Sequence, residues 1–169
     1  KSENRRKIKM LVPMRAILDA ADKNGYAQGA FNVNAVCQVK AAVDVHQILR
    51  SPAIIQGADL ANGFMGGRTD FANSTLEDKK AGAKNIGAAV KKYAADSDIP
   101  VALHLDHGKN FDSCIAAIEG GYTSVMIDGS SLPFDENVEL TREVVKYAHE
   151  RGVTVEGELG VLAGVEDEV

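Results

Sequence analysis

Three apolar segments of this chain end in residues that could do chemistry. The first ends in His104, Asp106 and His107, the second in Asp128, and the third in Glu158. If these carboxylates lie close together they repel one another, unless a cation or a proton compensates their charge. A divalent metal would do so, and the imidazole of His107 would add a nitrogen ligand of the kind that zinc accepts. The pattern predicts a metal site, and ordinary strand-end and helix-capping roles remain the alternative.

Other kinds of site are less well supported by the sequence. A Schiff-base enzyme needs a desolvated lysine, and no expected strand ends in one; Lys109 comes closest, in a loop. The phosphate-binding patterns G-x-G-x-x-G and G-x-x-x-x-G-K-[ST] are both absent from the sequence. His46 and His149 lie in expected helices, where we assign them to packing or to the surface.

Alternating strands and helices would have to position the three segment ends. The hydrophobic pattern predicts a first helix over 14–23, strands over 27–32, 53–56, 101–106, 123–128 and 153–158, and mostly loop over 57–75. Helices are expected between the strands, including 76–95 and 135–150. Such alternation implies parallel strands, whose carboxyl ends bind ligands. A doubly wound sheet and a (β/α)8 barrel both fit, but five βα units are too few for a whole barrel.

Composition limits the class of protein. The chain has 169 residues, as expected of a single domain, and its net charge of −5 argues against nucleic-acid binding. No apolar run approaches a membrane span, and no secretory signal is visible. The basic segment 1–10 is expected to be a solvated arm. Cys37 and Cys114 are expected to be free buried thiols, which favours a cytoplasmic location.

Several motifs together resemble one enzyme family. They are VALHLDHG at 101–108, SVMID at 124–128, PFDENV at 133–138, VEGELGVLAGVEDEV at 155–169 and GAFNVN at 29–34. In order and spacing they are similar to the N-terminal portion of class II, metal-dependent ketose-bisphosphate aldolases, of which fructose-bisphosphate aldolase is the best known. The resemblance implies an α/β fold of the (β/α)8 TIM-barrel type. This chain would cover about the first five βα units, as a single incomplete domain over 1–169.

The resemblance also implies a role for individual residues. Asp106 matches the catalytic acid/base, and Glu166 matches a glutamate that moves a proton at the dihydroxyacetone phosphate carbon. Asn32 matches a substrate-binding asparagine. The implied metal-binding residues are His107 for the catalytic Zn²⁺, and Asp128 and Glu158 for a second divalent or monovalent cation.

The implied reaction is the reversible cleavage of fructose 1,6-bisphosphate into dihydroxyacetone phosphate and glyceraldehyde 3-phosphate, with zinc as Lewis acid. A tagatose-bisphosphate or other ketose-bisphosphate aldolase, or a non-catalytic truncated fragment, are the alternatives. The full-length protein is expected to be a cytoplasmic homo-oligomer, a dimer or tetramer, that binds a phosphorylated ketose but neither nucleic acid nor membrane. The chain departs from the family's usual residues at Ala58, Lys109 and Ala163.

Overall fold

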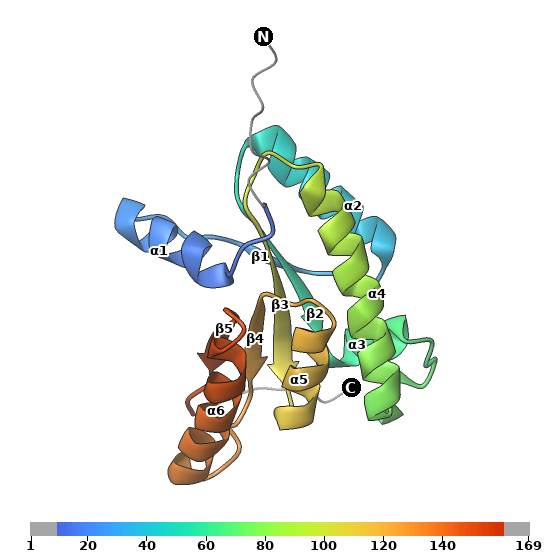
Figure 1. Cartoon of the computed structure of the whole chain (residues 1–169), viewed down its shortest axis with the longest axis vertical. Helices are drawn as coiled ribbons and strands as arrows, with labels where there is room; N and C mark the ends of the chain where they lie inside the picture. Colours follow the sequence, from blue (N-terminus) through green and yellow to red (C-terminus); the bar gives the residue numbers. More distant parts are fainter. Residues whose placement is uncertain (1–9, 161–169) are drawn as a thin grey trace.

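A five-stranded parallel sheet forms the centre of the molecule. The computed structural model describes residues 10–160. The strands are β1 (Ala30–Asn32), β2 (Ala53–Ala58), β3 (Val101–Gly108), β4 (Ser124–Ile127) and β5 (Thr154–Gly157), and they lie side by side in chain order (Figure 1). A doubly wound sheet reverses its strand order at a switch point, whereas a barrel does not. The uninterrupted order, with every pair parallel, therefore favours a partial TIM barrel over the doubly wound alternative.

Helices cover the sheet and connect its strands. They are α1 (Met14–Asn24), α2 (Val36–Leu49), α3 (Asp59–Met65), α4 (Leu76–Ala95), α5 (Phe111–Glu119) and α6 (Phe134–His149), with a short 3-10 turn, η1 (Phe71–Asn73). The expected helices over 14–23, 76–95 and 135–150 are confirmed to within a residue or so. Within the described residues, no helix is long and apolar enough to cross a membrane.

The expectation of mostly loop over 57–75 is wrong at α3. Its glycines suggested a loop because glycine weakens a helix interior. In the structure they allow close packing instead. A Cβ added at Gly63 would overlap the Ser74 side chain, and one added at Gly82 of α4 would overlap the carbonyl oxygen of Asn62. Glycine therefore lets α3 lie directly against α4.

The two faces of the sheet bury different clusters. One face packs against α2, α4 and α5 through a large core that includes Ile55, Leu103 and Ile86. On the other face, Ile17 of α1 packs with Ile54 and Ala102. The alternation of side chains along a strand explains this division, because neighbouring residues point to opposite faces. Helix α1 thus covers the face opposite α2, α4 and α5, near the amino ends of the strands. We call this face the inner face of the sheet.

The two cysteines differ in their surroundings. Cys114 is buried and free as expected, and burial raises the pKa of its thiol to about 12. The prediction for Cys37 is wrong, because this residue is exposed on α2. A hydrophobic residue on an amphipathic helix can face solvent without disturbing the pattern that predicts the helix.

Candidate active site

The end of β3 has an unusual backbone that turns one side chain toward β4. His107 has a φ of 49°, in the left-handed region that non-glycine residues seldom adopt. The pairing of β3 with β4 is irregular between Leu105 and Gly108. A Cβ at Gly108 would lie only 2.6 Å from the carbonyl oxygen of Met126, so glycine allows the two strands to approach here. His107 belongs to β3, although the sequence predicted a strand only over 101–106, and the backbone turns at His107 itself.

This turn brings together three residues from three successive strand ends. His107 Nδ1 lies 3.1 Å from Asp128 Oδ2 and 3.6 Å from Glu158 Oε2. One ligand atom from each of the three lies within 4.8 Å of the other two, and all three side chains are partly buried. The structure thus brings these three residues together, as the positions where the strands end predicted. Asp106, which the same argument placed with Asp128 and Glu158, does not belong to this group of ligand atoms.

The donor set of this cluster fits a divalent cation. One imidazole nitrogen and two carboxylate oxygens are the ligands that zinc and other borderline ions accept. Burial alone would raise the pKa of Asp128, but hydrogen bonds from Ser130 and His107 outweigh it and hold the pKa below its usual value. Ser130 donates from both its hydroxyl (2.6 Å) and its backbone N–H (3.1 Å) to Asp128 Oδ1. Asp128 is therefore ionised and oriented at neutral pH.

Asn137 holds the chain where it leaves β5. Its side-chain nitrogen donates a 2.7 Å hydrogen bond to the carbonyl oxygen of Glu158. Asn137 is buried on α6, and a Cβ at Gly129 would overlap its side-chain oxygen. Asn137 belongs to the PFDENV motif, but no role for it was predicted from the sequence. Its contact fixes the backbone that carries Glu158.

Asp106 lies on the inner face of the sheet, beside Asn32 of β1. Asn32 Nδ2 donates a 3.3 Å hydrogen bond to Asp106 Oδ2. In the parallel register, Ala58 of β2 is the direct neighbour of Asp106. The two residues predicted for acid/base chemistry and for substrate binding are therefore in contact.

Two further residues of the inner face carry perturbed pKa values. Burial raises the pKa of Glu156, and the negative charges of Asp106 and Glu158 add to this effect. Burial lowers the pKa of His104 to about 4, so its ring is neutral at pH 7. His104 Nδ1 lies 2.8 Å from Ser124 Oγ, and its Nε2 lies 3.4 Å from Glu156 Oε2. Neither residue was predicted from the sequence to be catalytic or to bind the metal.

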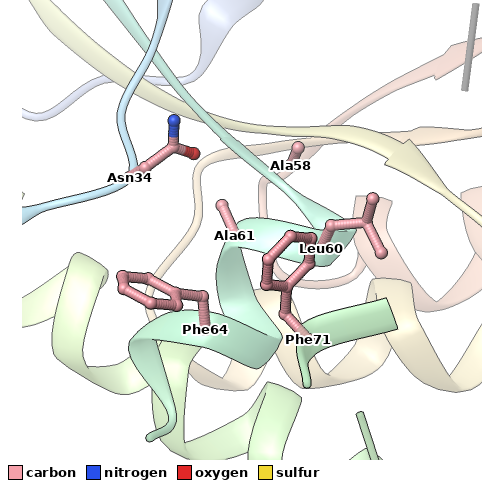
Figure 2. Close-up of a pocket in the computed structure, with 6 residues that line it drawn as sticks. All are labelled: Asn34, Ala58, Leu60, Ala61, Phe64 and Phe71. Atoms are coloured by element: carbon pink, nitrogen blue, oxygen red, sulfur yellow. The ribbon is translucent and has the colours of Figure 1, made fainter. Parts of the chain in front are cut away.

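An apolar pocket of about 420 Å³ lies next to this polar region. Figure 2 shows the six residues that line it: Asn34, Ala58, Leu60, Ala61, Phe64 and Phe71. They come from the segment after β1, the end of β2, helix α3 and η1. The rings of Phe64 and Phe71 pack edge to face, with centroids 6.3 Å apart. The carboxyl edge of the sheet thus has a charged part over β3–β5 and an apolar part beside β2.

Some residues singled out in the sequence lie outside the described range. Glu166 and Ala163 fall within 161–169, and the basic segment falls within 1–9 apart from its last residue. Their roles therefore stay predictions.

Comparison with known proteins identifies a family. Residues 12–169 match the family described as fructose-bisphosphate aldolase class-II. The chain is 46% identical over 163 residues to a fructose-bisphosphate aldolase of Treponema pallidum, covering 94% of this chain and 45% of that protein. It is 42% identical over 161 residues to one of Geobacillus stearothermophilus, covering 94% and 51%.

Solved structures agree with this result. The YdjI aldolase of Escherichia coli K12 superposes with a TM-score of 0.72 at 30% identity, over 89% of this chain and 51% of that one. A fructose-bisphosphate aldolase of Campylobacter jejuni gives 0.74 at 25% identity, over 89% and 45%. The chain spans about half the length of the curated relatives it matches.

Proposed function

The chain belongs to the class II fructose-bisphosphate aldolase family, and we propose that its full-length protein reversibly cleaves fructose 1,6-bisphosphate into dihydroxyacetone phosphate and glyceraldehyde 3-phosphate. The observation that carries the proposal is the cluster of His107, Asp128 and Glu158 at the ends of three strands that include the strand of Asp106. Aldol cleavage needs an electrophile at the ketone and a base at a hydroxyl. The cluster and Asp106 have the chemistry for these two tasks.

The metal-binding part of the proposal rests on the donor set. His107 would bind a zinc ion, and Asp128 and Glu158 would hold a second or alternative cation position. A zinc ion bound there supplies Lewis-acid polarisation of the ketone oxygen. Ser130 keeps Asp128 ionised and oriented, and Asn137 fixes the backbone at Glu158. These contacts reduce the rearrangement that the ligands need when a cation binds.

The proton-transfer part of the proposal assigns two carboxyl groups. Asp106 would take the proton from the C4 hydroxyl during cleavage and return it during condensation. Its hydrogen bond from Asn32 helps to orient the carboxylate, which supports this role. Asn32 would also contact the substrate. Glu166 would exchange the proton at the dihydroxyacetone phosphate carbon.

The location, the oligomeric state and the substrate class are also proposed from membership of the family. We expect a cytoplasmic homo-oligomer, dimeric or tetrameric, that acts on a phosphorylated ketose. The test is an assay of the full-length protein with fructose 1,6-bisphosphate, in which both triose phosphates are quantified. Equimolar formation of the two products is expected. Failure to form either product at any metal loading would refute the proposed reaction.

A further inference from the structure

A chain of side-chain contacts crosses three strands on the inner face of the sheet. His104 on β3 directs its Nδ1 to Ser124 Oγ on β4, at 2.8 Å, and its Nε2 to Glu156 Oε2 on β5, at 3.4 Å. Neighbouring strands are about 4.8 Å apart, so these contacts span about 10 Å across the sheet. We call Ser124, His104 and Glu156 the three-strand bridge.

The protonation of the ring gives each contact of the bridge a donor and an acceptor. His104 is neutral at pH 7 and therefore carries a single N–H. A carboxylate accepts hydrogen bonds, which places this N–H on Nε2, facing Glu156. Nδ1 is then the acceptor for the hydroxyl of Ser124. Both ring nitrogens therefore have a matched partner, one on each of the next two strands.

Burial makes the orientation of the ring specific. The side chain of His104 is 3% exposed, and Ser124 is fully buried. A buried polar group costs free energy unless it is hydrogen-bonded, so the ring is stable in the orientation that satisfies both nitrogens. The interior of a TIM barrel is usually filled by branched apolar side chains, which pack without directional bonds between strands. The polar residues at these positions therefore constrain the strands more than apolar ones would.

The bridge joins the same three strands whose ends carry the proposed metal ligands. His107, Asp128 and Glu158 follow its members on β3, β4 and β5 by three, four and two residues. The backbone pairing of β3 with β4 is irregular between Leu105 and Gly108, directly after the bridge. An irregular ladder constrains the local position of a strand less than a regular one does. Side-chain contacts just before this point can supply the missing constraint.

We propose that Ser124, His104 and Glu156 are positioning residues that hold the ends of β3, β4 and β5 at the spacing a divalent cation needs. The inference rests on the metal-binding part of the proposed function and adds residues outside the ligand set. Loss of the bridge should weaken zinc binding about ten-fold, an effect typical of residues that orient metal ligands. Glu156 is the most suitable member to replace, because its side chain is 48% exposed and its removal leaves no cavity in the core.

The test measures the zinc dissociation constant of the full-length protein by competition with a chelator. Glu156→Leu and Glu156→Gln both remove the charge, but only glutamine keeps an oxygen that accepts from Nε2–H. The constant should be about ten-fold higher in Glu156→Leu than in Glu156→Gln, and about ten-fold higher in Ser124→Ala than in the wild type. Val125→Ala is the control, because it truncates a buried side chain next to Ser124 on the opposite face. It should lower the midpoint of thermal unfolding and leave zinc affinity unchanged.

Equal zinc affinity in Glu156→Leu and Glu156→Gln, or wild-type affinity in Ser124→Ala, would overturn the positioning role. A loss of the same size in Val125→Ala would also overturn it, because general destabilisation would then explain the effect. Cleavage of fructose 1,6-bisphosphate by the wild type, measured in parallel, separates this claim from the proposed reaction. A wild-type protein that binds zinc without cleaving the sugar refutes the reaction alone, and one that binds no zinc overturns the bridge and the metal site together.

Discussion

Asp106 and His107 are adjacent in the chain but have different partners. Asp106 continues the inner face of β3 and accepts a hydrogen bond from Asn32, whereas the left-handed φ of His107 turns its ring toward Asp128. A non-glycine residue in this region costs of order 1–3 kcal/mol, which the surrounding contacts must offset. The backbone at His107 therefore separates a proton-transfer group from a metal-binding group within two residues.

Replacement of Asp106 by asparagine tests this separation. The amide of Asp106→Asn would keep the shape of the side chain but could not accept the C4 proton, so kcat should fall about 10²- to 10⁴-fold. Metal content, measured by atomic emission, should remain that of the wild type. In His107→Ala the metal content itself should fall. Near-normal turnover in Asp106→Asn would show that another group is the acid/base.

The buried ring of His104 predicts a pH dependence of stability. Its pKa is about 4 in the folded protein and about 6.5 when unfolded, so between these values the unfolded chain binds more protons. The stabilisation is fully present above pH 6.5 and is lost as the pH falls toward 4, by up to about 3 kcal/mol.

Urea unfolding of the full-length protein at pH 7 and pH 4.5 measures this effect. His104→Gln should reduce the loss of stability between the two pH values, whereas His149→Gln, at an exposed position, should not. Equal losses in the wild type and in His104→Gln would mean that His104 does not control the transition.

Most of the residues that converge at the site could be predicted from the sequence, because they directly follow buried strands. Polar residues that directly follow buried strands must meet at one edge of a parallel sheet, which predicted that His107, Asp128 and Glu158 converge. The same argument placed Asp106 with them, but Asp106 lies outside this group and contacts Asn32 instead. The supporting contacts of Ser130 and Asn137 depend on where a loop and a helix return in space. The spacing of residues in the sequence does not predict where that loop and that helix lie relative to the site.

At the scale of elements, periodicity predicted the long helices and the strands but not α3. Helices α1, α4 and α6 have regular apolar positions that repeat with the helical period. Helix α3 is short, contains Gly63, and is stabilised by its contact with α4 rather than by its own sequence. Tertiary packing therefore overrides local preference in this segment.

Gly82 allows a test in which two effects have opposite signs. By helix propensity alone, Gly82→Ala should stabilise α4 by about 1 kcal/mol. The added Cβ would overlap the backbone of Asn62, and overpacking costs typically about 1–3 kcal/mol or more. The midpoint of thermal unfolding should therefore fall, while that of Lys91→Ala, an exposed position on the same helix, should hardly change. A rise in the midpoint for Gly82→Ala would contradict the close packing of α3 on α4.

At the scale of the whole molecule, the sheet has two open edges. In the described residues β1 pairs only with β2, and β5 pairs only with β4. A (β/α)8 barrel closes such edges with further strands, and the curated relatives are about twice as long as this chain. The order of the strands could be expected from the alternation of elements. The curvature that closes a barrel is not encoded in any single segment.

We therefore expect residues 1–169, expressed alone, to lack aldolase activity. The described cluster supplies one nitrogen ligand, and unpaired strand edges promote association between chains. Aldol cleavage, zinc affinity and the oligomeric state of this segment would be measured beside those of the full-length protein. A soluble monomer with full activity would show that no further strands are needed to complete the site.

The central claim is that the cluster at the ends of β3, β4 and β5 binds the metal of a metal-dependent aldolase. Its most direct test is to treat the full-length protein with a chelator, and separately with borohydride in the presence of substrate, and to measure residual cleavage and bound metal. We predict that chelation removes both the metal and the activity, that added zinc restores both, and that borohydride has no effect. Activity that survives loss of the metal and is abolished only by borohydride would contradict the account.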